Sequence, residues 1–123
     1  MKKEIVIGEK RMMITSSALT PFTYKDLTGR DMLPDIANVE NAISGITEQE
    51  EKEQIETLSG LLETLLRLAY VMNQEADNTA PAWKEWLKGI KHTLKDRDWI
   101  KEVMEVASNC FLGNIEENIN TEQ

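Results

Sequence analysis

The sequence of 123 residues has little of what catalytic and metal-binding sites are built from. It contains one cysteine and one histidine, which excludes a disulfide within the chain and a zinc site of several cysteines. Its apolar runs are far shorter than the roughly 20 residues of a membrane span, and no signal peptide follows Met1. It also lacks a Gly-rich phosphate loop and a nucleophile elbow. We therefore expect a cytoplasmic protein with no membrane contact and no cofactor.

The negative charge of the chain is distributed unevenly. The net charge is −8; residues 46–83 carry two basic and eight acidic side chains, whereas residues 84–101 carry six basic and three acidic ones. An acidic surface repels a phosphate backbone, so we expect no nucleic-acid binding. The lysines between residues 84 and 95 recur at helical spacing, which is typical of a solvent-exposed helix face. A phosphate or RNA stripe is the less favoured interpretation.

Two short alternating segments predict an N-terminal β-hairpin at about residues 3–17. One face of each strand is apolar, with Ile5 and Ile7 on the first and Met12 and Ile14 on the second. Gly8 in the turn can adopt a positive φ. Met13 must point away from Met12, so one of the two methionines lies outside the core unless another chain covers it. An isolated hairpin is marginal in water, so it must pack on the rest of the chain or on another chain.

About four helices are expected after the hairpin, between residues 23 and 113. Capping-box spacings predict a short helical turn from Thr23 and a long helix from Thr47, and Asp31, Pro81 and either Asp96 or Asp98 predict the starts of three more helices. The helix at about 48–75 is apolar on most of its circumference in its second half, which is typical of a central helix. The expected core includes Leu62, Leu65, Leu66, Trp99, Val103 and Phe111. Inward positions are also expected at Leu33, Ile36, Ala37, Val39, Ile43, Ile55 and Leu58.

The chain is therefore expected to be one domain of the mainly α (α+β) class, spanning residues 1–123. It would consist of the N-terminal hairpin, a bundle of about four helices, and a loosely held polar tail at 114–123.

The titratable residues show no arrangement that catalysis requires. His92 has no neighbouring carboxylate or second ligand in the sequence, so we expect it at the surface. Cys110 lies on an apolar helix face, where burial suppresses thiol reactivity. Metal-dependent all-α nucleotide pyrophosphohydrolases need acidic pairs facing each other across helices, and Glu102 and Glu105 face no such pair. The acidic cluster at 48–56 is typical of a solvated helix start. We therefore expect no catalytic residue and no bound metal, and this enzyme class is the least favoured function.

The segment from Pro21 to Asp31 carries the most specific motif of the chain. An aromatic-Tyr-basic step (Phe22, Tyr24, Lys25) precedes Gly29-Arg30-Asp31, which opens the first long helix, and Thr28 stands where an aromatic residue is frequent. A hairpin precedes this motif, and an acidic long helix and a C-terminal helix ending at residues 107–113 follow it. In this order of features the chain resembles the tail assembly chaperones of long-tailed (siphovirus-type) phages and prophages of Gram-positive bacteria.

The resemblance implies a non-enzymatic role in virion assembly. Such a protein binds the tape-measure protein and keeps it soluble during tail tube assembly, acts in the cytoplasm of the host bacterium, and is absent from the mature virion. The family commonly also makes a longer product by ribosomal frameshifting. The residues alone leave open a second interpretation, a small helical adaptor or inhibitor that binds a host or phage partner.

The hairpin edge is the expected contact surface for a homo-oligomer or for the tape-measure protein. Unpaired strand edges accept further strands, and aromatic residues are enriched at interface hot spots. The residues predicted to bind a partner are Met12, Met13, Phe22, Tyr24, Trp83 and Trp86.

Overall fold

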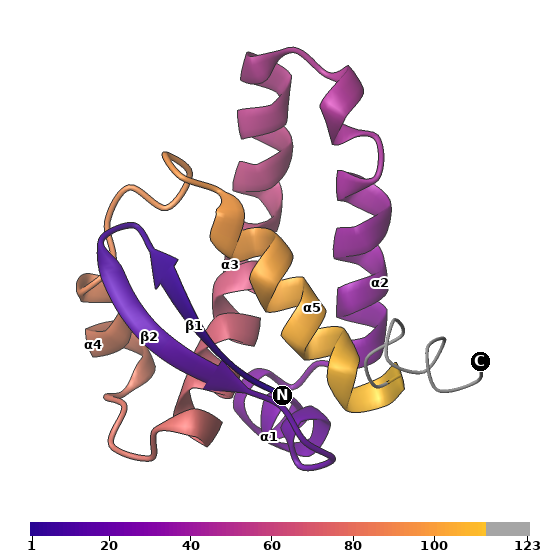
Figure 1. The fold of residues 1–123 in the computed structure, drawn as a ribbon. Coiled ribbons are helices and arrows are strands. Elements are labelled where there is room, and N and C mark those ends of the chain that lie inside the picture. The colour runs from indigo at the N-terminus through magenta and orange to yellow at the C-terminus, as the bar shows by residue number, and fades with distance from the viewer. Residues whose placement is uncertain (113–123) are drawn as a thin grey trace, which may run out of the picture.

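The computed structural model describes residues 1–112 as a β-hairpin followed by helices (Figure 1). The elements in chain order are β1 (Lys2–Ile7), β2 (Lys10–Thr15), α1 (Thr20–Thr28), α2 (Met32–Ile43), the short 3-10 helix η1 (Ile46–Glu48), α3 (Glu51–Ala76), α4 (Trp83–Lys88) and α5 (Asp98–Leu112). The predicted mainly helical class with one N-terminal hairpin is confirmed. The predicted loose tail at 114–123 lies outside the described residues.

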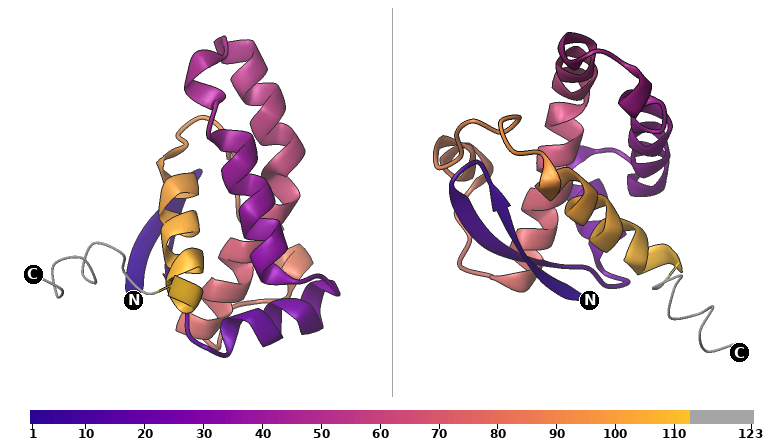
Figure 2. Two further views of the ribbon diagram at one scale, coloured as in Figure 1. Left: turned by 90° about the vertical axis from the view of Figure 1, so that its right-hand side faces the viewer. Right: turned by 45° about the horizontal axis from the view of Figure 1, so that its top comes forward.

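Helix α3 is the element around which the others are arranged. The hairpin lies across its C-terminal half, with β2 against α3 and β1 beside α5 (Figure 1). The antiparallel pair of α2 and α3 extends well beyond the hairpin at one end, whereas α1 closes the opposite end of the molecule (Figure 2). None of the helices within residues 1–112 combines the length and the apolar character that crossing a membrane requires.

The hairpin packs on the rest of the chain through one face and through its turn. Ile5, Ile7, Met12 and Ile14 are buried, while Met13 points to the other face and is half-buried, as the alternation predicts. The two-residue loop begins at Gly8 with φ 62°, the backbone conformation that glycine provides in such turns. A Cβ atom at Gly8 would lie 1.7 Å from the carbonyl oxygen of Lys91. The turn is therefore packed directly against the segment between α4 and α5.

The two halves of α3 differ in burial. Its C-terminal half contributes eight buried residues, interrupted only by the half-buried Arg67: Leu65, Leu66, Leu68, Ala69, Tyr70, Val71, Met72 and Asn73. In the first ten residues of the helix only Leu58 is buried, and Ile55, which we expected to face inward, is 40% exposed. The prediction of a central buried helix therefore holds for the C-terminal half.

Several helix starts differ from the sequence-based prediction. α1 begins at Thr20 instead of Thr23, with Pro21 in its first turn, where its missing N–H breaks no helical hydrogen bond. α3 begins at Glu51, because residues 46–48 close a 3-10 turn and Glu50 is extended; the predicted capping box at Thr47 does not form. α4 begins two residues after Pro81. Asp96 accepts a hydrogen bond from the backbone N–H of Asp98 at the start of α5, as one of the two alternatives predicted.

The inward faces of α2 and α5 also differ in part from expectation. In α2 the buried residues are Met32, Asp35, Ile36 and Val39, while Leu33 is 52% exposed and Ala37 is exposed. The inward position of Asp35 accounts for this rotation of the apolar face. Leu65, Leu66, Trp99 and Val103 are buried as predicted, and Leu62 is half-buried. The prediction for Phe111 is wrong: it is 37% exposed, because the buried stripe of α5 ends at Ala107.

Candidate protein-binding surfaces

Tyr24 and Arg30 of the motif connect α1 to α2 through hydrogen bonds to Asp35, and we call these three residues the latch. The Tyr24 hydroxyl donates to Asp35 Oδ2 at 2.7 Å, and the Arg30 guanidinium donates to both carboxylate oxygens of Asp35 at 2.9 and 2.7 Å. Asp35 is 3% exposed. Gly29 ends α1 with φ 73°, a left-handed conformation that turns the chain toward α2.

The latch sets the protonation state of its members. Hydrogen bonds from Arg30 lower the pKa of Asp35, against the opposing effect of its burial. Burial, reinforced by the bond to Asp35, raises the pKa of Tyr24. Tyr24 is therefore a neutral phenol and Asp35 an ionised carboxylate in the folded protein. In this state the motif residues Tyr24 and Arg30 join α1 to α2.

Three of the six residues predicted to bind a partner are buried. The Tyr24 side chain is fully buried, Met12 is buried against the helices, and Trp86 is buried in the core. Tyr24 therefore does not form part of an exposed apolar contact, contrary to our expectation, whereas a buried Met12 agrees with the expectation that one of the two methionines lies outside the core. Phe22, in contrast, is 69% exposed on α1, and Met13 and Trp83 are half-buried.

The tryptophans of α4 belong to an aromatic cluster on α3. Trp83 stacks on Trp86 with 5.8 Å between ring centroids, and Tyr70 meets both rings edge-on at 5.3 and 5.2 Å. The Arg67 guanidinium lies 5.2 Å from the centroid of Trp83. The cluster fixes α4 to α3, which favours a structural role for Trp83 and Trp86.

A cleft between β2 and α4 contains the reachable part of the predicted hairpin surface. Its volume is about 420 Å³, and Met13, Trp86, Pro81 and Glu85 are among its lining residues. Asn73 donates to the Met13 carbonyl oxygen at 2.8 Å and accepts a hydrogen bond from Trp86 Nε1 at 3.0 Å. Asn73 thus occupies one of the backbone groups that an added strand would need at the β2 edge.

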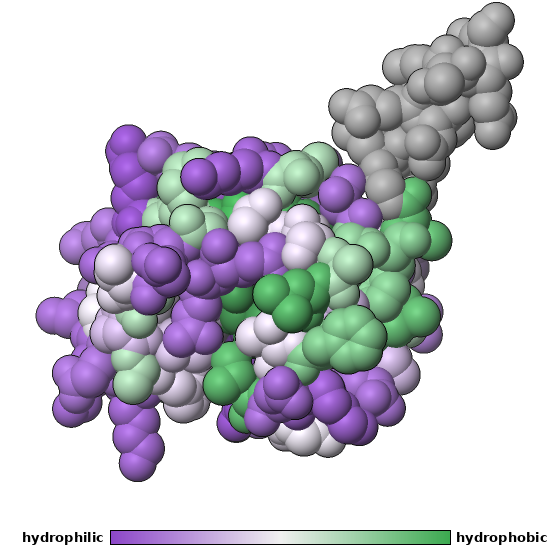
Figure 3. Space-filling view, turned by 90° about the horizontal axis from the view of Figure 1, so that it is seen from below, coloured by the Kyte–Doolittle hydropathy of each residue, from purple (hydrophilic) through white to green (hydrophobic). Residues whose placement is uncertain are grey.

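A second apolar region lies at the lower end of the molecule (Figure 3). Hydrophobic side chains gather there beside the C-terminal end of α5. Leu33, Phe111 and Leu112 surround a small hollow of about 70 Å³ between α2 and α5. The sequence pattern did not identify this face, because it assigned Leu33 and Phe111 to the core.

An apolar groove of about 340 Å³ lies where the first half of α5 approaches the distal part of the α2–α3 pair. We call it the α2–α5 groove. Apolar side chains form its floor, and Gln54, Arg97 and Lys101 form its polar rim. The apolar members are Ile43, Ile46, Leu58, Ile100 and Met104. Ile43 and Leu58 were expected to face inward on their helices, but the sequence does not show how far apart those helices lie.

The rim of the groove is fixed at one end by Arg97. Its guanidinium donates to the Leu94 carbonyl oxygen at 3.0 Å, to Gln54 at 3.3 Å and to Glu51 at 3.1 Å. These contacts tie the segment before α5 to the start of α3. The groove is therefore bounded by elements that are already connected, as a preformed binding site requires.

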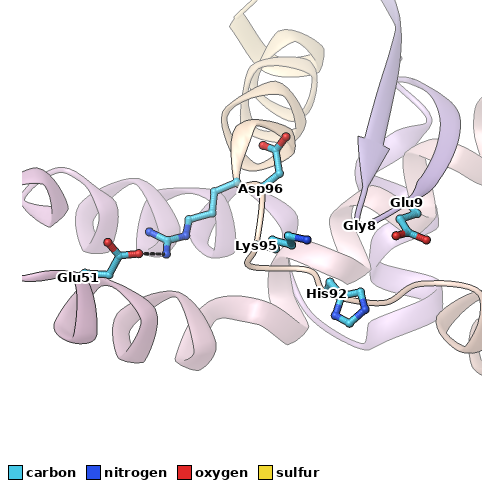
Figure 4. A pocket seen from close by; sticks show the side chains of 7 residues that line it. Gly8, Glu9, Glu51, His92, Lys95 and Asp96 are labelled. Carbon is cyan, nitrogen blue, oxygen red and sulfur yellow. Dashed lines mark hydrogen bonds and ion pairs between the residues drawn. The ribbon is translucent and has the colours of Figure 1, made fainter.

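A polar pocket that shares Arg97 with the groove lies beside it (Figure 4). Gly8, Glu9, His92, Lys95 and Asp96 are among its lining residues, and its volume is about 630 Å³. His92 is exposed, as predicted, with φ 55°. Within residues 1–112 no group of three or more His, Cys, Asp or Glu side chains is placed to hold a metal ion.

Cys110 is half-buried near the end of α5. Burial raises the pKa of its thiol to about 11, and the thiol donates to the Ala107 carbonyl oxygen at 3.1 Å. The thiol is therefore protonated at neutral pH and is a weak nucleophile.

The sequence matches no protein-family model, and searches of curated proteins and of solved structures also give no significant match.

Proposed function

We propose that this protein is a phage tail assembly chaperone that binds the tape-measure protein and keeps it soluble during assembly of the tail tube. The observation that carries the proposal is the α2–α5 groove, an open apolar site on an acidic protein. The resemblance in sequence between Phe22 and Asp31 supports the same role.

A groove of this kind suits a helical client. Amphipathic helices bind by laying their apolar face into a hydrophobic groove, with anchors spaced three or four residues apart. Ile100 and Met104 are four residues apart on α5, which matches that spacing along the floor of the groove. Burial of apolar area contributes roughly 25 cal/mol per Å², so a few anchors supply useful affinity. The net charge of −8 favours solubility of a protein that presents an open apolar groove.

The predicted homo-oligomer has a separate candidate surface at the outer edge of β1. Ile7 and Lys10 flank a two-residue loop and form a hydrogen-bonded pair, so the pairs alternate along the hairpin. The backbone groups of Glu4 and Val6 therefore point away from β2. Within residues 1–112 no backbone group of another element bonds to them. Self-association through this edge stays a prediction.

Co-expression with tape-measure fragments tests the proposal. The wild-type protein should keep an apolar fragment in the soluble fraction, and Ile46→Glu should abolish this, because Ile46 lines the groove and is only half-buried. Ile55→Glu is the matched control: it makes the same change on the neighbouring helix, outside the groove. Circular dichroism of both variants checks that the helices are retained.

A wild-type protein that leaves every tape-measure fragment insoluble would contradict the chaperone proposal. The same groove would then serve the second candidate, a small helical adaptor or inhibitor. The gene order separates the two, since a gene between the major tail protein and a very long tape-measure gene favours the chaperone.

A further inference from the structure

The charge of the α2–α5 groove indicates what kind of helix it selects. We infer, on the basis of the proposed function, that the groove binds an amphipathic helix whose apolar stripe is flanked by acidic side chains. In this inference Lys101 forms the ion pair with those acidic side chains. The groove lining contains two cations, Arg97 and Lys101, and no acidic side chain. Both cations belong to the basic stretch at residues 84–101 of a chain whose net charge is −8.

The two cations differ in how far they are already paired. Arg97 is held by Glu51 at 3.1 Å, so its charge is partly neutralised within the protein. Lys101 is exposed and forms no ion pair with any other residue of the described part, residues 1–112. Lys101 is therefore the cation that can accept a carboxylate from a bound partner.

The position of Lys101 relates this charge to the apolar floor. Ile100 and Met104 line the floor four residues apart, and Lys101 projects from the same stretch of α5 into the lining. Residues four apart on a helix are about 6 Å apart along its axis. A client helix that seats two apolar anchors on this floor would therefore present its flanking residues to Lys101. Rim charges of this kind mainly set specificity and orientation.

The charge of the rest of the protein also favours a client helix with acidic flanking side chains over one with basic flanking side chains. The acidic remainder of the protein attracts basic segments without regard to site, so a basic flank would not orient a client in this groove. An acidic flank is repelled by the acidic stretch at residues 46–83 but not by the basic stretch at residues 84–101, to which Arg97 and Lys101 of the groove belong. The client is thus selected by apolar anchors together with a carboxylate, and wrong segments are excluded by like charge.

A pair of labelled helical peptides tests the inference on the full-length protein. Both carry the same leucine stripe; one has glutamates and the other lysines beside that stripe. Fluorescence anisotropy at low salt should show tighter binding of the acidic peptide to the wild-type protein by about two- to fivefold, the effect of an exposed ion pair. Lys101→Glu should reverse that preference.

Lys84→Glu is the matched control, since Lys84 is an exposed lysine on α4 outside the groove. The inference is overturned if Lys101→Glu and Lys84→Glu change the preference equally, or if neither peptide binds. It is also overturned if peptide binding falls as the protein concentration rises, because a second copy would then occupy the groove. Retained tape-measure solubility without peptide binding would leave the proposed function standing. Charge-dependent peptide binding by a protein that solubilises no tape-measure fragment would support the charge selectivity of the groove and contradict the proposed chaperone function.

Discussion

The two halves of α3 belong to different parts of the molecule. The C-terminal half is enclosed by the hairpin, α1 and α5, and eight of its residues between Leu65 and Asn73 are buried. The N-terminal half buries only Leu58 and forms one wall of the α2–α5 groove. One continuous helix thus serves as a scaffold at one end and as part of a binding surface at the other.

The polar contacts of the two halves differ in the same way. In the C-terminal half, Asn73 links β2 to α4, and Tyr70 donates to the Pro81 carbonyl oxygen at 2.9 Å. In the N-terminal half, Glu51 pairs with Arg97 at an exposed site, where ion pairs contribute little to stability. A helix with such a gradient can accommodate a client at its loosely packed end while its packed end stays fixed.

Truncation of one apolar side chain in each half should give the largest difference in stability. Leu68 is fully buried, so Leu68→Ala should lower the free energy of unfolding by about 2–5 kcal/mol through lost burial and a new cavity. Ile55→Ala should change it by about 0.5 kcal/mol or less, because Ile55 is already exposed to solvent. Urea denaturation of the two variants measures both values. Equal losses would show that the N-terminal half is packed as tightly as the C-terminal half.

Substitution of alanine for Gly8 and for Gly60 should change the stability of the folded protein in opposite directions. Gly8→Ala places a Cβ atom against the Lys91 carbonyl oxygen at a positive φ, so it should cost about 1–3 kcal/mol. Gly60→Ala enters open space where the two halves of α3 meet, and should stabilise the helix by up to about 1 kcal/mol. Thermal melting followed by circular dichroism reports both shifts. A stabilised Gly8→Ala variant would mean that the turn is not packed on the segment after α4.

Acidification should act mainly through the latch at Asp35. Because the pKa of Asp35 is lowered in the folded protein, its contribution is present above an unfolded-state pKa of about 3.9 and is lost as the pH falls through the folded value. Asp35→Asn should therefore lower stability at neutral pH and flatten its decline below about pH 4. Glu53→Gln, an exposed carboxylate in the N-terminal half of α3, is the control. An unchanged decline in Asp35→Asn would refute the role of the latch.

The hairpin and the helices were predictable because their signals are local. Alternation defined the strands around Gly8, and the apolar circumference of residues 61–72 identified the buried half of α3. The helix starts at Thr23 and Thr47 were wrong: α1 begins at Thr20 and α3 at Glu51, and neither start has a side-chain cap. The face of α2 was partly wrong because a charged residue, Asp35, is buried once Arg30 and Tyr24 satisfy it.

The candidate groove could not be predicted in the same way. Its lining comes from α2, η1, α3 and the start of α5, and the distances between these elements are set by the whole fold. Leu58 is buried and Ile43 half-buried, in line with the inward positions expected for them, but an apolar stripe in the sequence does not show whether a groove lies between two helices. The partner-binding prediction favoured the hairpin because unpaired edges and adjacent methionines can be recognised in a sequence.

The methionines offer the most direct test of where a client binds. Met104 lines the α2–α5 groove, Met13 lines the cleft beside the hairpin, and Met72 is fully buried in the core. Methyl NMR spectra of methionine-labelled protein should be recorded during titration with a helical tape-measure peptide. We predict that the Met104 signal shifts progressively, while the signals of Met13 and Met72 keep their positions. A shift at Met13 with an unchanged Met104 signal would contradict binding in the groove and assign the client to the hairpin.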